Sequence, residues 1–453
     1  MVIKALEQKK LQGIYEQEGN QVVVLYGRAD SGMEQVVSDF ISDKKFFYYR
    51  ARETSARHQC EMMGEEIARK FDVKLQKNTY DEYFNRIKSG DPTKFVLVID
   101  EFQLLVKKDP AFLESIKKLR TKRLYPGPVM IILCSSSIAW TEQDFQGGEL
   151  SAGIRINAYI KMEELHFVEV VHAFPNFQVR DCVQIYGIIG GVVDYINRWN
   201  PRRSIKENVC KLILSRDGYL FHGAENLIAS ELREPAVYNA ILAAIAAGYN
   251  KLNDLYLVTG FSRAKISVYM KNLSYFDIIE KVVSFETGGW ENAKKGMYQI
   301  KDTFVNFWYR FVFPHLSELY LLRPDVFYDR YVEPDLDSYL NRYFRNVCME
   351  YLMLLNQMNK LPFVLTKMGT WLGKTGNIDI IAHNTARENL VGMCNWEKPA
   401  FTLDMCKELF ASMEKAKITS KHCYLFSAKA FSPELVKAAE EDERLELIDM
   451  NEL

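Results

Sequence analysis

The sequence contains neither a C-x-x-C pair nor a long apolar run, and its charges nearly cancel. Its eight cysteines are scattered along 453 residues, so neither a zinc ribbon nor a disulfide framework is predicted. We therefore expect a reduced, cytoplasmic setting. The most apolar stretch, Ile241 to Ala247, is far shorter than the roughly 18 residues that a membrane helix needs, and no signal-peptide pattern is found, so no membrane contact is expected.

A net charge of −1 means that any contact with nucleic acid must come from a local basic patch rather than from a global field. No internal repeat or low-complexity tract is found in the sequence. What is present is a long chain with 48% apolar residues. It is large enough for two to four ordinary domains, each with its own core.

Residues 1–165 alternate short apolar strands with helical patterns. This alternation is typical of a mostly parallel sheet covered by helices, an α/β fold. Strands are expected at Val22–Tyr26, Phe46–Arg50, Phe95–Asp100, Val129–Ser135 and Ala158–Met162, and helices at Gln59–Phe71 and Ala111–Leu119.

A glycine-rich loop follows the first strand. Residues 27–34 read Gly-Arg-Ala-Asp-Ser-Gly-Met-Glu and precede an amphipathic stretch, Gln35 to Ile41. Strand, glycine turn and helix together indicate a phosphate-binding loop, in which backbone N–H groups, a lysine and a hydroxyl on Mg²⁺ hold the nucleotide. Here Met33 and Glu34 stand at the lysine and hydroxyl positions. The cation is therefore missing, and a carboxylate points toward the place of the phosphate; packing of Met33 as core filler at the helix start is the simpler role.

Two acids end the strand Phe95–Asp100. In a P-loop ATPase the first acid, here Asp100, holds Mg²⁺, and the second, here Glu101, orients or activates the attacking water. Ser135 ends the next predicted strand, where a polar tip senses the γ-phosphate, although serine is also an ordinary turn residue. The candidate nucleotide contacts on the loop and at this strand end are Gly27, Arg28, Asp30, Ser31, Gly32, Met33, Glu34 and Ser135.

Residues 166–235 turn helical and are expected to form a helical lid. We expect one helix over Ile185–Trp199, with Gly190 and Gly191 inside it and Pro201 beyond its end.

Residues 236–313 form a different module. Helices are expected at Val237–Ala247, Leu252–Thr259 and from a Ser262 cap to Leu273, followed by strands Ile278–Phe285 and Met297–Ile300. Three helices and a β-hairpin are typical of a winged helix-turn-helix.

The third helix of this module is the candidate DNA-reading element. Its cations would meet phosphate, its hydroxyls would reach base edges, and two lysines on the hairpin would add groove or backbone contacts to double-stranded DNA. The candidate residues are Ser262, Arg263, Lys265, Lys271, Lys294 and Lys295. The alternative is that this module joins proteins or copies of the chain and that its charges are simply solvated.

Residues 314–453 show the order helix, three strands, helix, strand. The elements are expected at Tyr339–Asn356, Phe363–Trp371, Asn377–His383, Asn389–Trp396, Leu403–Ala416 and Cys423–Ser427. This order is typical of the restriction-endonuclease-like fold, whose sites use an acid on one strand and Glu-x-Lys on the next to hold Mg²⁺. Asp379 supplies the first acid, but Met393 and Asn395 replace the other two groups. Nuclease activity is therefore not expected, and Asp379 is a vestigial metal ligand that more simply accepts a structural hydrogen bond.

Several short motifs resemble the archaeal-type P-loop ATPases of the AAA+/STAND group, which join an ATPase domain to a winged helix and a C-terminal domain of unknown function. The resemblance rests on Leu25-Tyr-Gly-Arg28, Val98-Ile-Asp-Glu-Phe102, Leu133-Cys-Ser-Ser-Ser137, Ile185-Tyr-Gly-Ile-Ile-Gly-Gly-Val192, Glu231-Leu-Arg-Glu-Pro235 and Phe307-Trp-Tyr-Arg-Phe-Val312. It implies binding and hydrolysis of ATP with Mg²⁺.

The family pattern is matched only in part. Gly27, Gly32, Asp100 and Glu101 match it, whereas Met33 and Glu34 do not. Arg155 matches one of a family arginine pair whose other member is Ile156 here, and Val193 replaces a proline of a motif near the nucleotide.

Three functions follow from these features. The leading one is a pseudo-ATPase or weak nucleotide-binding regulator that acts through DNA or protein contacts. The second is an active ATPase in which Arg28, Lys44 or Lys45 replaces the lost lysine. The third is an interaction scaffold that binds no nucleotide, and calorimetric titration with Mg²⁺-ATP separates the first two functions from this third one.

Overall fold

A computed structural model describes residues 4–87, 93–121, 127–232, 234–285, 296–373 and 376–453. The chain divides into two compact units. The first comprises residues 1–164 and 192–194, and the second comprises residues 165–191 and 195–453. Among the described residues, no helix combines the length and the apolar character needed to cross a bilayer.

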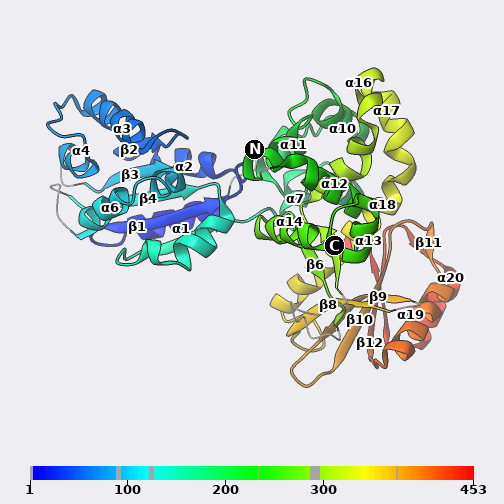
Figure 1. The fold of residues 1–453 in the computed structure, drawn as a ribbon. Coiled ribbons are helices and arrows are strands. Elements are labelled where there is room, and N and C mark those ends of the chain that lie inside the picture. Colours follow the sequence, from blue (N-terminus) through cyan, green and yellow to red (C-terminus); the bar gives the residue numbers. More distant parts are fainter. Residues whose placement is uncertain (1–3, 88–92, 122–126, 233, 286–295, 374–375) are drawn as a thin grey trace. The chain divides into compact units, whose positions relative to one another are not determined.

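The first unit contains a five-stranded sheet and its covering helices (Figure 1). Its strands are β1 (Gln21–Gly27), β2 (Phe46–Arg50), β3 (Phe95–Asp100), β4 (Val129–Ser135) and β5 (Ala158–Met162). Its helical elements are α1 (Ala5–Tyr15), α2 (Met33–Ile41), α3 (Ala56–Phe71), α4 (Tyr80–Arg86), α5 (Phe102–Val106), α6 (Ala111–Thr121), η1 (Trp140–Gln146) and η2 (Glu149–Ser151).

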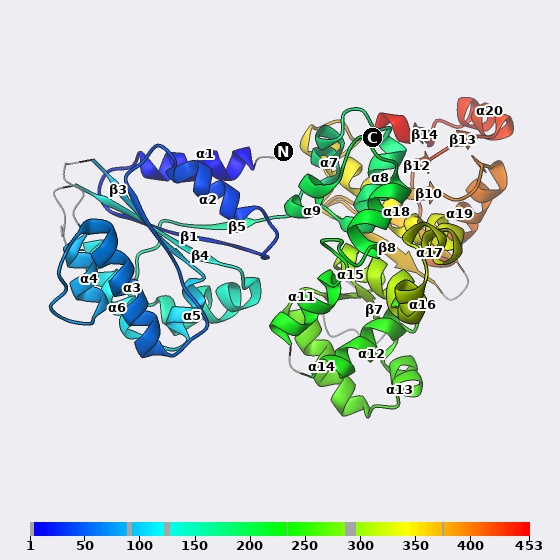
Figure 2. The same cartoon turned by 90° about the horizontal axis from the view of Figure 1, so that it is seen from above.

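All strands of this sheet run parallel, in the order β2-β3-β4-β1-β5. Every residue of β1, β3 and β4 is buried, as expected for strands covered on both faces. Helices α1 and α2 pack on one face, and α3 to α6 with η1 pack on the other (Figure 2). The predicted parallel α/β fold of this region is confirmed.

The second unit begins with helices. They are α7 (Phe167–Ala173), α8 (Val179–Ile189), α9 (Val193–Arg198, whose first two residues belong to the first unit), α10 (Ile205–Val209), η3 (Cys210–Leu214), α11 (Gly223–Glu231), α12 (Pro235–Ala246), α13 (Leu252–Thr259) and α14 (Arg263–Tyr275). The antiparallel pair β6 (Ile279–Val282) and β7 (Met297–Ile300) follows α14. This is the element order expected for the winged helix, and that assignment stays a prediction.

An aromatic helical segment leads to the last part of the chain. It comprises α15 (Thr303–Phe307), η5 (Trp308–Val312), η6 (Phe313–His315), α16 (Leu316–Leu321), α17 (Pro324–Tyr331) and the long helix α18 (Glu333–Gln357). The final elements are β8 (Lys367–Leu372), β9 (Asn377–His383), β10 (Asn389–Asn395), β11 (Ala400–Phe401), α19 (Leu403–Ala416), β12 (His422–Ser427), β13 (Ala430–Phe431), α20 (Pro433–Glu441), β14 (Leu445–Asp449) and η7 (Met450–Glu452).

The second large sheet is mixed, with the order β14-β12-β10-β9-β8. Strands β8, β9 and β10 pair antiparallel, whereas β10, β12 and β14 pair parallel. Apolar side chains of α19 and of the buried strands form its core. A C-terminal mixed α/β domain is therefore present, and its nuclease-like ancestry stays a prediction.

One expected helix is divided in two. The predicted helix Ile185–Trp199 breaks between α8 and α9 at Gly190 and Gly191. Gly190 has a φ of +67°, and a Cβ on Gly191 would lie 2.0 Å from the carbonyl oxygen of Leu165. The two glycines therefore form a turn that other residues could not adopt without displacing the backbone.

Candidate nucleotide-binding site

The glycine loop lies at the switch point of the first sheet. From the carboxyl end of β1 the chain runs through the loop into α2 and then enters β2, at the far edge of the sheet beyond β4 and β3. In open parallel sheets, ligands bind at the carboxyl ends of the strands where the order reverses. Gly27, Arg50, Asp100 and Ser135 end their strands at this same edge.

Two glycines of the loop are required by close contacts. A Cβ on Gly27 would lie 2.6 Å from Cβ of Met162, and one on Gly32 would lie 2.9 Å from a methyl of Val193. Gly32 also has a φ of +82° as the residue before α2. The N–H of Asp194 donates to the carbonyl of Asp30 at 3.1 Å. The loop is therefore built as a tight phosphate-loop turn, although the lysine is gone.

Ser31 lies inside this loop. Its side chain is 2% exposed, and its Oγ has no hydrogen-bond partner among the described residues. Its N–H donates to the carbonyl of Arg28 at 3.1 Å, while the Arg28 guanidinium pairs with Glu164 at 2.9 Å. A buried hydroxyl without a partner is costly unless a ligand or water satisfies it. Ser31 thus suits an acceptor such as a phosphate oxygen.

The two substituted positions have different fates. Met33, the first residue of α2, is 5% exposed and belongs to the core on the α1–α2 face. Glu34 is exposed, and its carboxylate pairs with the guanidinium of Arg50. Met33 thus occupies the core, and the expected repulsive carboxylate is partly neutralised within the protein.

Arg50 is a functional candidate that the sequence analysis did not select. It ends β2 and lies beside Asp100 in the strand register. Its Nε is 3.6 Å from Oδ2 of Asp100, and its Nη2 is 3.9 Å from Oε1 of Glu101. The hydrogen bond with Glu34 is the main cause that raises the pKa of Arg50. One guanidinium therefore joins the first turn of α2 to both strand acids.

The cations considered as substitutes for the lysine lie elsewhere. Lys44 follows α2 and bonds to the carbonyl of Phe40 at 2.8 Å and to Asp43 at 2.6 Å. Lys45 precedes β2 and accepts, through its carbonyl, from Val96 near the start of β3. Both lie at the amino-terminal edge of the strands, opposite the loop.

The strand acids are held by the protein itself. Asp100 accepts from the Tyr48 hydroxyl at 2.6 Å and from the N–H of Glu101 at 3.0 Å, and burial raises the pKa of its carboxyl. Glu101 has a φ of +55° and accepts from Ser136 Oγ at 2.7 Å. Ser135 is fully buried and accepts from the N–H of Ser137 at 3.2 Å, whereas its neighbour Ser136 contacts Glu101.

Arg155 is not brought together with the loop in this chain. It is exposed and precedes β5. Two residues later, the N–H of Asn157 donates to the carbonyl of Val22 at the start of β1, so Arg155 lies toward the amino-terminal edge of the sheet. Its nearby charge helps to lower the pKa of Arg120, after burial of that side chain.

These residues fit a phosphate group better than they fit a metal ion. The loop backbone and Ser31 suit phosphate oxygens. The acids that would hold Mg²⁺ are occupied by Tyr48, Arg50 and a backbone N–H. Among the described residues, no group of three or more His, Cys, Asp or Glu side chains could hold a metal ion.

On the predicted DNA-reading helix α14, Arg263 is hydrogen-bonded within the protein, whereas the two lysines are exposed. Ser262 accepts from the N–H of Lys265 and thus caps the helix as predicted. Arg263 donates to Asn253 at 2.7 Å and lies over the ring of Tyr256 at 4.1 Å. Lys265 and Lys271 are exposed, with the ammonium of Lys265 5.1 Å from the Phe261 ring centre. The predicted contacts Lys294 and Lys295 lie outside the described residues.

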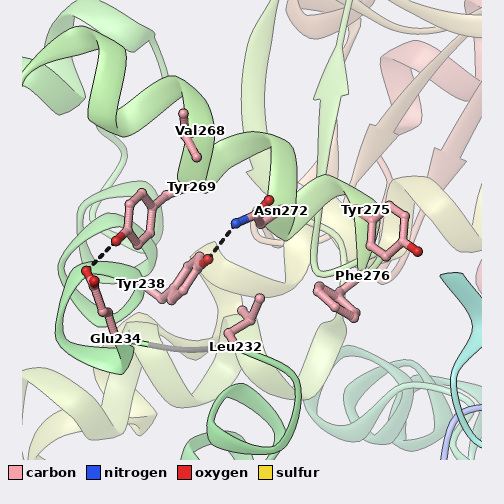
Figure 3. Close-up of a pocket in the computed structure, with 8 residues that line it drawn as sticks. All are labelled: Leu232, Glu234, Tyr238, Val268, Tyr269, Asn272, Tyr275 and Phe276. Atoms are coloured by element: carbon pink, nitrogen blue, oxygen red, sulfur yellow. Dashed lines mark hydrogen bonds between the residues drawn. The ribbon is translucent and has the colours of Figure 1, made fainter. Parts of the chain in front are cut away.

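A pocket of about 500 Å³ adjoins α14 (Figure 3). The Tyr269 hydroxyl donates to Glu234, which raises the pKa of Tyr269 to about 12. Asn272 donates to the Tyr238 hydroxyl at 2.9 Å. Tyr269 therefore faces the start of α12, and Lys265 and Lys271 remain as the candidates for phosphate contact on this helix.

The nuclease-like position contains a partly buried acid, Asp379, with Met393 and Asn395 in place of the glutamate and the lysine of the Glu-x-Lys pattern. Asp379 lies on β9 and accepts from the N–H of Cys394 on β10 at 3.0 Å, and burial raises the pKa of its carboxyl. Asn395 is buried and bonds to the backbone of Lys398 through both its oxygen and its amide. The carboxylate of Glu397 accepts from Asn341. Asn395 thus closes the turn that follows β10, and Glu397 is bound to a side chain of α18.

Comparisons with known proteins agree with this geometry. Residues 4–198 match a family of ATPase domains found predominantly in Archaea, and residues 308–415 match a family of archaeal and bacterial proteins of unknown function. An uncharacterized protein of Methanocaldococcus jannaschii is 28% identical over 382 residues, which cover 84% of this chain and 83% of that protein.

Two solved structures resemble the chain at low identity. The Walker-type ATPase PABY2304 of Pyrococcus abyssi is 16% identical, with a TM-score of 0.49 over 68% of this chain and 96% of its own. The ORC2 protein of Aeropyrum pernix is 9% identical, with a TM-score of 0.44 over 70% of this chain and 92% of its own.

The parallel sheet and its glycine loop define a P-loop ATPase domain. Residues 4–198 therefore belong to the family of archaeal ATPase domains, and with the match over residues 308–415 the chain resembles the archaeal-type P-loop ATPases.

Proposed function

We propose that this chain is a P-loop ATPase-family protein that binds nucleotide weakly, does not turn it over efficiently, and acts as a regulator through DNA or protein contacts. The observation that carries the proposal is where the side chains at the two substituted loop positions lie. Met33 is committed to the core, and Glu34 is paired with Arg50. The loop thus offers a backbone cradle and the Ser31 hydroxyl, without the lysine.

Electrostatics supports weak binding. The loss of a charge-assisted contact to phosphate is worth roughly 1.5–3 kcal/mol, or about one to two decades of affinity. Three carboxylates, those of Glu34, Asp100 and Glu101, share one guanidinium at this edge. The local charge is therefore negative where phosphates would approach, and repulsion in this partly buried setting is screened less than in bulk water.

The rate of hydrolysis is expected to be lowered more than the affinity for nucleotide. Negative charge develops on the transferred phosphoryl group in the transition state, and cations aimed at that charge supply most of the stabilisation. Arg50 is the cation found beside the acids, and it is already shared among them. A protein with this arrangement would retain the fold of an ATPase while its site serves as a sensor or as a structural element.

Calorimetric titration with Mg²⁺-ATP, followed by a phosphate-release assay on the same sample, tests the proposal. We expect binding only at high micromolar to millimolar nucleotide and phosphate release no faster than in an Asp100→Asn/Glu101→Gln control. Micromolar binding with release well above that control would establish the active-ATPase alternative, and loss of that release in Arg50→Met would identify its cation. Absence of heat at millimolar nucleotide would favour a scaffold.

The regulatory part of the proposal rests on the second unit. Lys265 and Lys271 are exposed on α14, the third helix of the proposed winged helix. In such modules this helix enters the major groove, and its lysines contact phosphate. We therefore propose double-stranded DNA as the partner of this helix; an affinity for DNA that does not depend on salt would argue against these phosphate contacts.

A further inference from the structure

The guanidinium of Arg50 joins the two positions that hold the metal ion in a phosphate-binding loop. In such a loop, Mg²⁺ is held by the hydroxyl that follows the lysine and by the acid that ends the neighbouring strand. Here Glu34 stands at the hydroxyl position and Asp100 is the strand acid. Arg50 pairs with Glu34, and its Nε is 3.6 Å from Asp100.

We infer that Arg50 is a built-in substitute for the divalent cation, a permanent counter-ion that makes this edge of the sheet independent of Mg²⁺. The inference rests on the proposed function, because a site that must turn over Mg²⁺-ATP would need its acids free for the metal. It assigns a role to a residue outside the loop and the strand acids.

The substitutions at positions 34 and 50 are chemically matched. A serine or threonine hydroxyl is a good ligand for Mg²⁺ but a weak partner for arginine, whereas a carboxylate forms a strong charge-assisted pair with a guanidinium. Glu34 therefore gives Arg50 a partner on α2, and Arg50 neutralises a carboxylate that would otherwise face Asp100 and Glu101. A glutamate at this position is thus explained by its partner on β2.

Burial makes this counter-ion necessary. The side chains of Asp100 and Glu101 are 7% and 16% exposed, whereas that of Arg50 is 51% exposed. Removing one partner of a buried charge pair leaves the other uncompensated, which is strongly destabilising. Without Arg50, the carboxylates of Glu34, Asp100 and Glu101 would lose the guanidinium with which each of them pairs. Carboxylate oxygens are the ligands that Mg²⁺ and Mn²⁺ prefer, so an Arg50→Met variant should acquire a divalent-cation site that the wild-type protein lacks.

Thermal unfolding in buffers with and without Mn²⁺, free of nucleotide, tests this inference. The wild-type midpoint should not change with Mn²⁺. Arg50→Met should unfold at a lower temperature, and Mn²⁺ at about 100 times its Kd should raise its midpoint by about 5–10 °C. The gain should vanish in Arg50→Met/Asp100→Asn.

Arg52→Met is the matched control. Arg52 lies two residues further along, its side chain is 59% exposed, and it pairs with Glu66 at 3.2 Å. Its variant should show no Mn²⁺ dependence. Arg50→Lys keeps one charge but cannot form a forked contact with two carboxylates, so its midpoint should show an intermediate Mn²⁺ shift. This variant tests the inference if Arg50→Met does not fold.

Two outcomes would overturn the inference. The first would come from an Mn²⁺ titration in which the paramagnetic resonance signal of free Mn²⁺ measures binding. The inference fails if the wild-type protein binds Mn²⁺ as tightly as Arg50→Met does, and if Asp100→Asn abolishes that binding. The other is a folded Arg50→Met that gains no Mn²⁺-dependent stability. Because neither measurement contains nucleotide, failure here is distinct from failure of the proposed function, which the ATP titration decides.

Discussion

The hydroxyl of Tyr48 donates to Oδ2 of Asp100 across 2.6 Å. Tyr48 lies on β2 and Asp100 ends β3, so a neighbouring strand supplies a donor to the acid expected to hold a metal ion. The other carboxylate oxygen accepts from the N–H of Glu101 at 3.0 Å. Both oxygens are thus satisfied by the protein, and burial still raises the pKa of the carboxyl above its usual value.

A raised pKa predicts that Asp100 lowers stability at neutral pH. The folded state holds this proton more tightly than the unfolded chain, so the contribution of Asp100 to stability is fullest below the unfolded pKa near 3.8 and is lost as pH rises through the folded pKa. Asp100→Asn should therefore raise the unfolding midpoint at pH 7, and the gain should shrink toward pH 4. Tyr48→Phe, which removes a donor, should be less stable than wild type at pH 7. A less stable Asp100→Asn at pH 7 would contradict this account.

The buried position of Met33 gives a second prediction. Because Met33 packs in the core on the α1–α2 face, Met33→Ala should lower the free energy of unfolding by about 2–4 kcal/mol. Ser38→Ala, an exposed position on the same helix, should change it by less than about 0.5 kcal/mol. Denaturant unfolding measures both. Equal effects would show that the methionine side chain is not part of this core.

Gly32 and Gly13 form a matched pair of glycines in the first unit. Gly32 has a positive φ and contacts Val193, whereas a Cβ on Gly13, inside helix α1, would meet nothing within 4 Å. Gly32→Ala should cost at least about 1–2 kcal/mol, and Gly13→Ala should stabilise by about 0.5–1 kcal/mol. Opposite signs in thermal unfolding are the expected result; a neutral Gly32→Ala would mean that the loop relaxes freely.

The proposed DNA contact has a salt-dependent signature. If Lys265 and Lys271 each neutralise a phosphate, the double Gln variant should reduce the slope of log K against log salt by about 2. A Lys407→Gln/Lys437→Gln variant, changed on α19 and α20, should retain the wild-type slope. Fluorescence anisotropy with duplex DNA at several salt concentrations measures these slopes. An unchanged slope in the α14 variant would exclude phosphate contacts by these two lysines.

The strands of the first sheet could be predicted because their apolar runs are continuous and end abruptly. Phe46–Arg50, Phe95–Asp100, Val129–Ser135 and Ala158–Met162 have the expected bounds. The expected helix Ile185–Trp199 failed at its glycine pair because a close backbone contact with Leu165, distant in sequence, requires a turn there.

Arg50 was missed for a related reason. Its place beside Asp100 depends on the pairing of β2 with β3, which no local pattern specifies. The available signal was positional, since a charged residue that ends a parallel strand lies at the edge where the other strands end. Proximity in sequence to the loop favoured Arg28, Lys44 and Lys45 instead, and two of these lie at the opposite edge.

The segment 192–194 determines where the chain can be truncated to obtain the first unit by itself. It belongs to the first unit although the chain has already entered the second at residue 165. A fragment that stops at residue 164 would contain every strand of the first sheet, yet it would lack the Val193 methyl against Gly32 and the Asp194 N–H bound to Asp30. A fragment prepared for separate study should therefore extend through residue 198, the end of α9, so that the loop keeps its contacts with Val193 and Asp194.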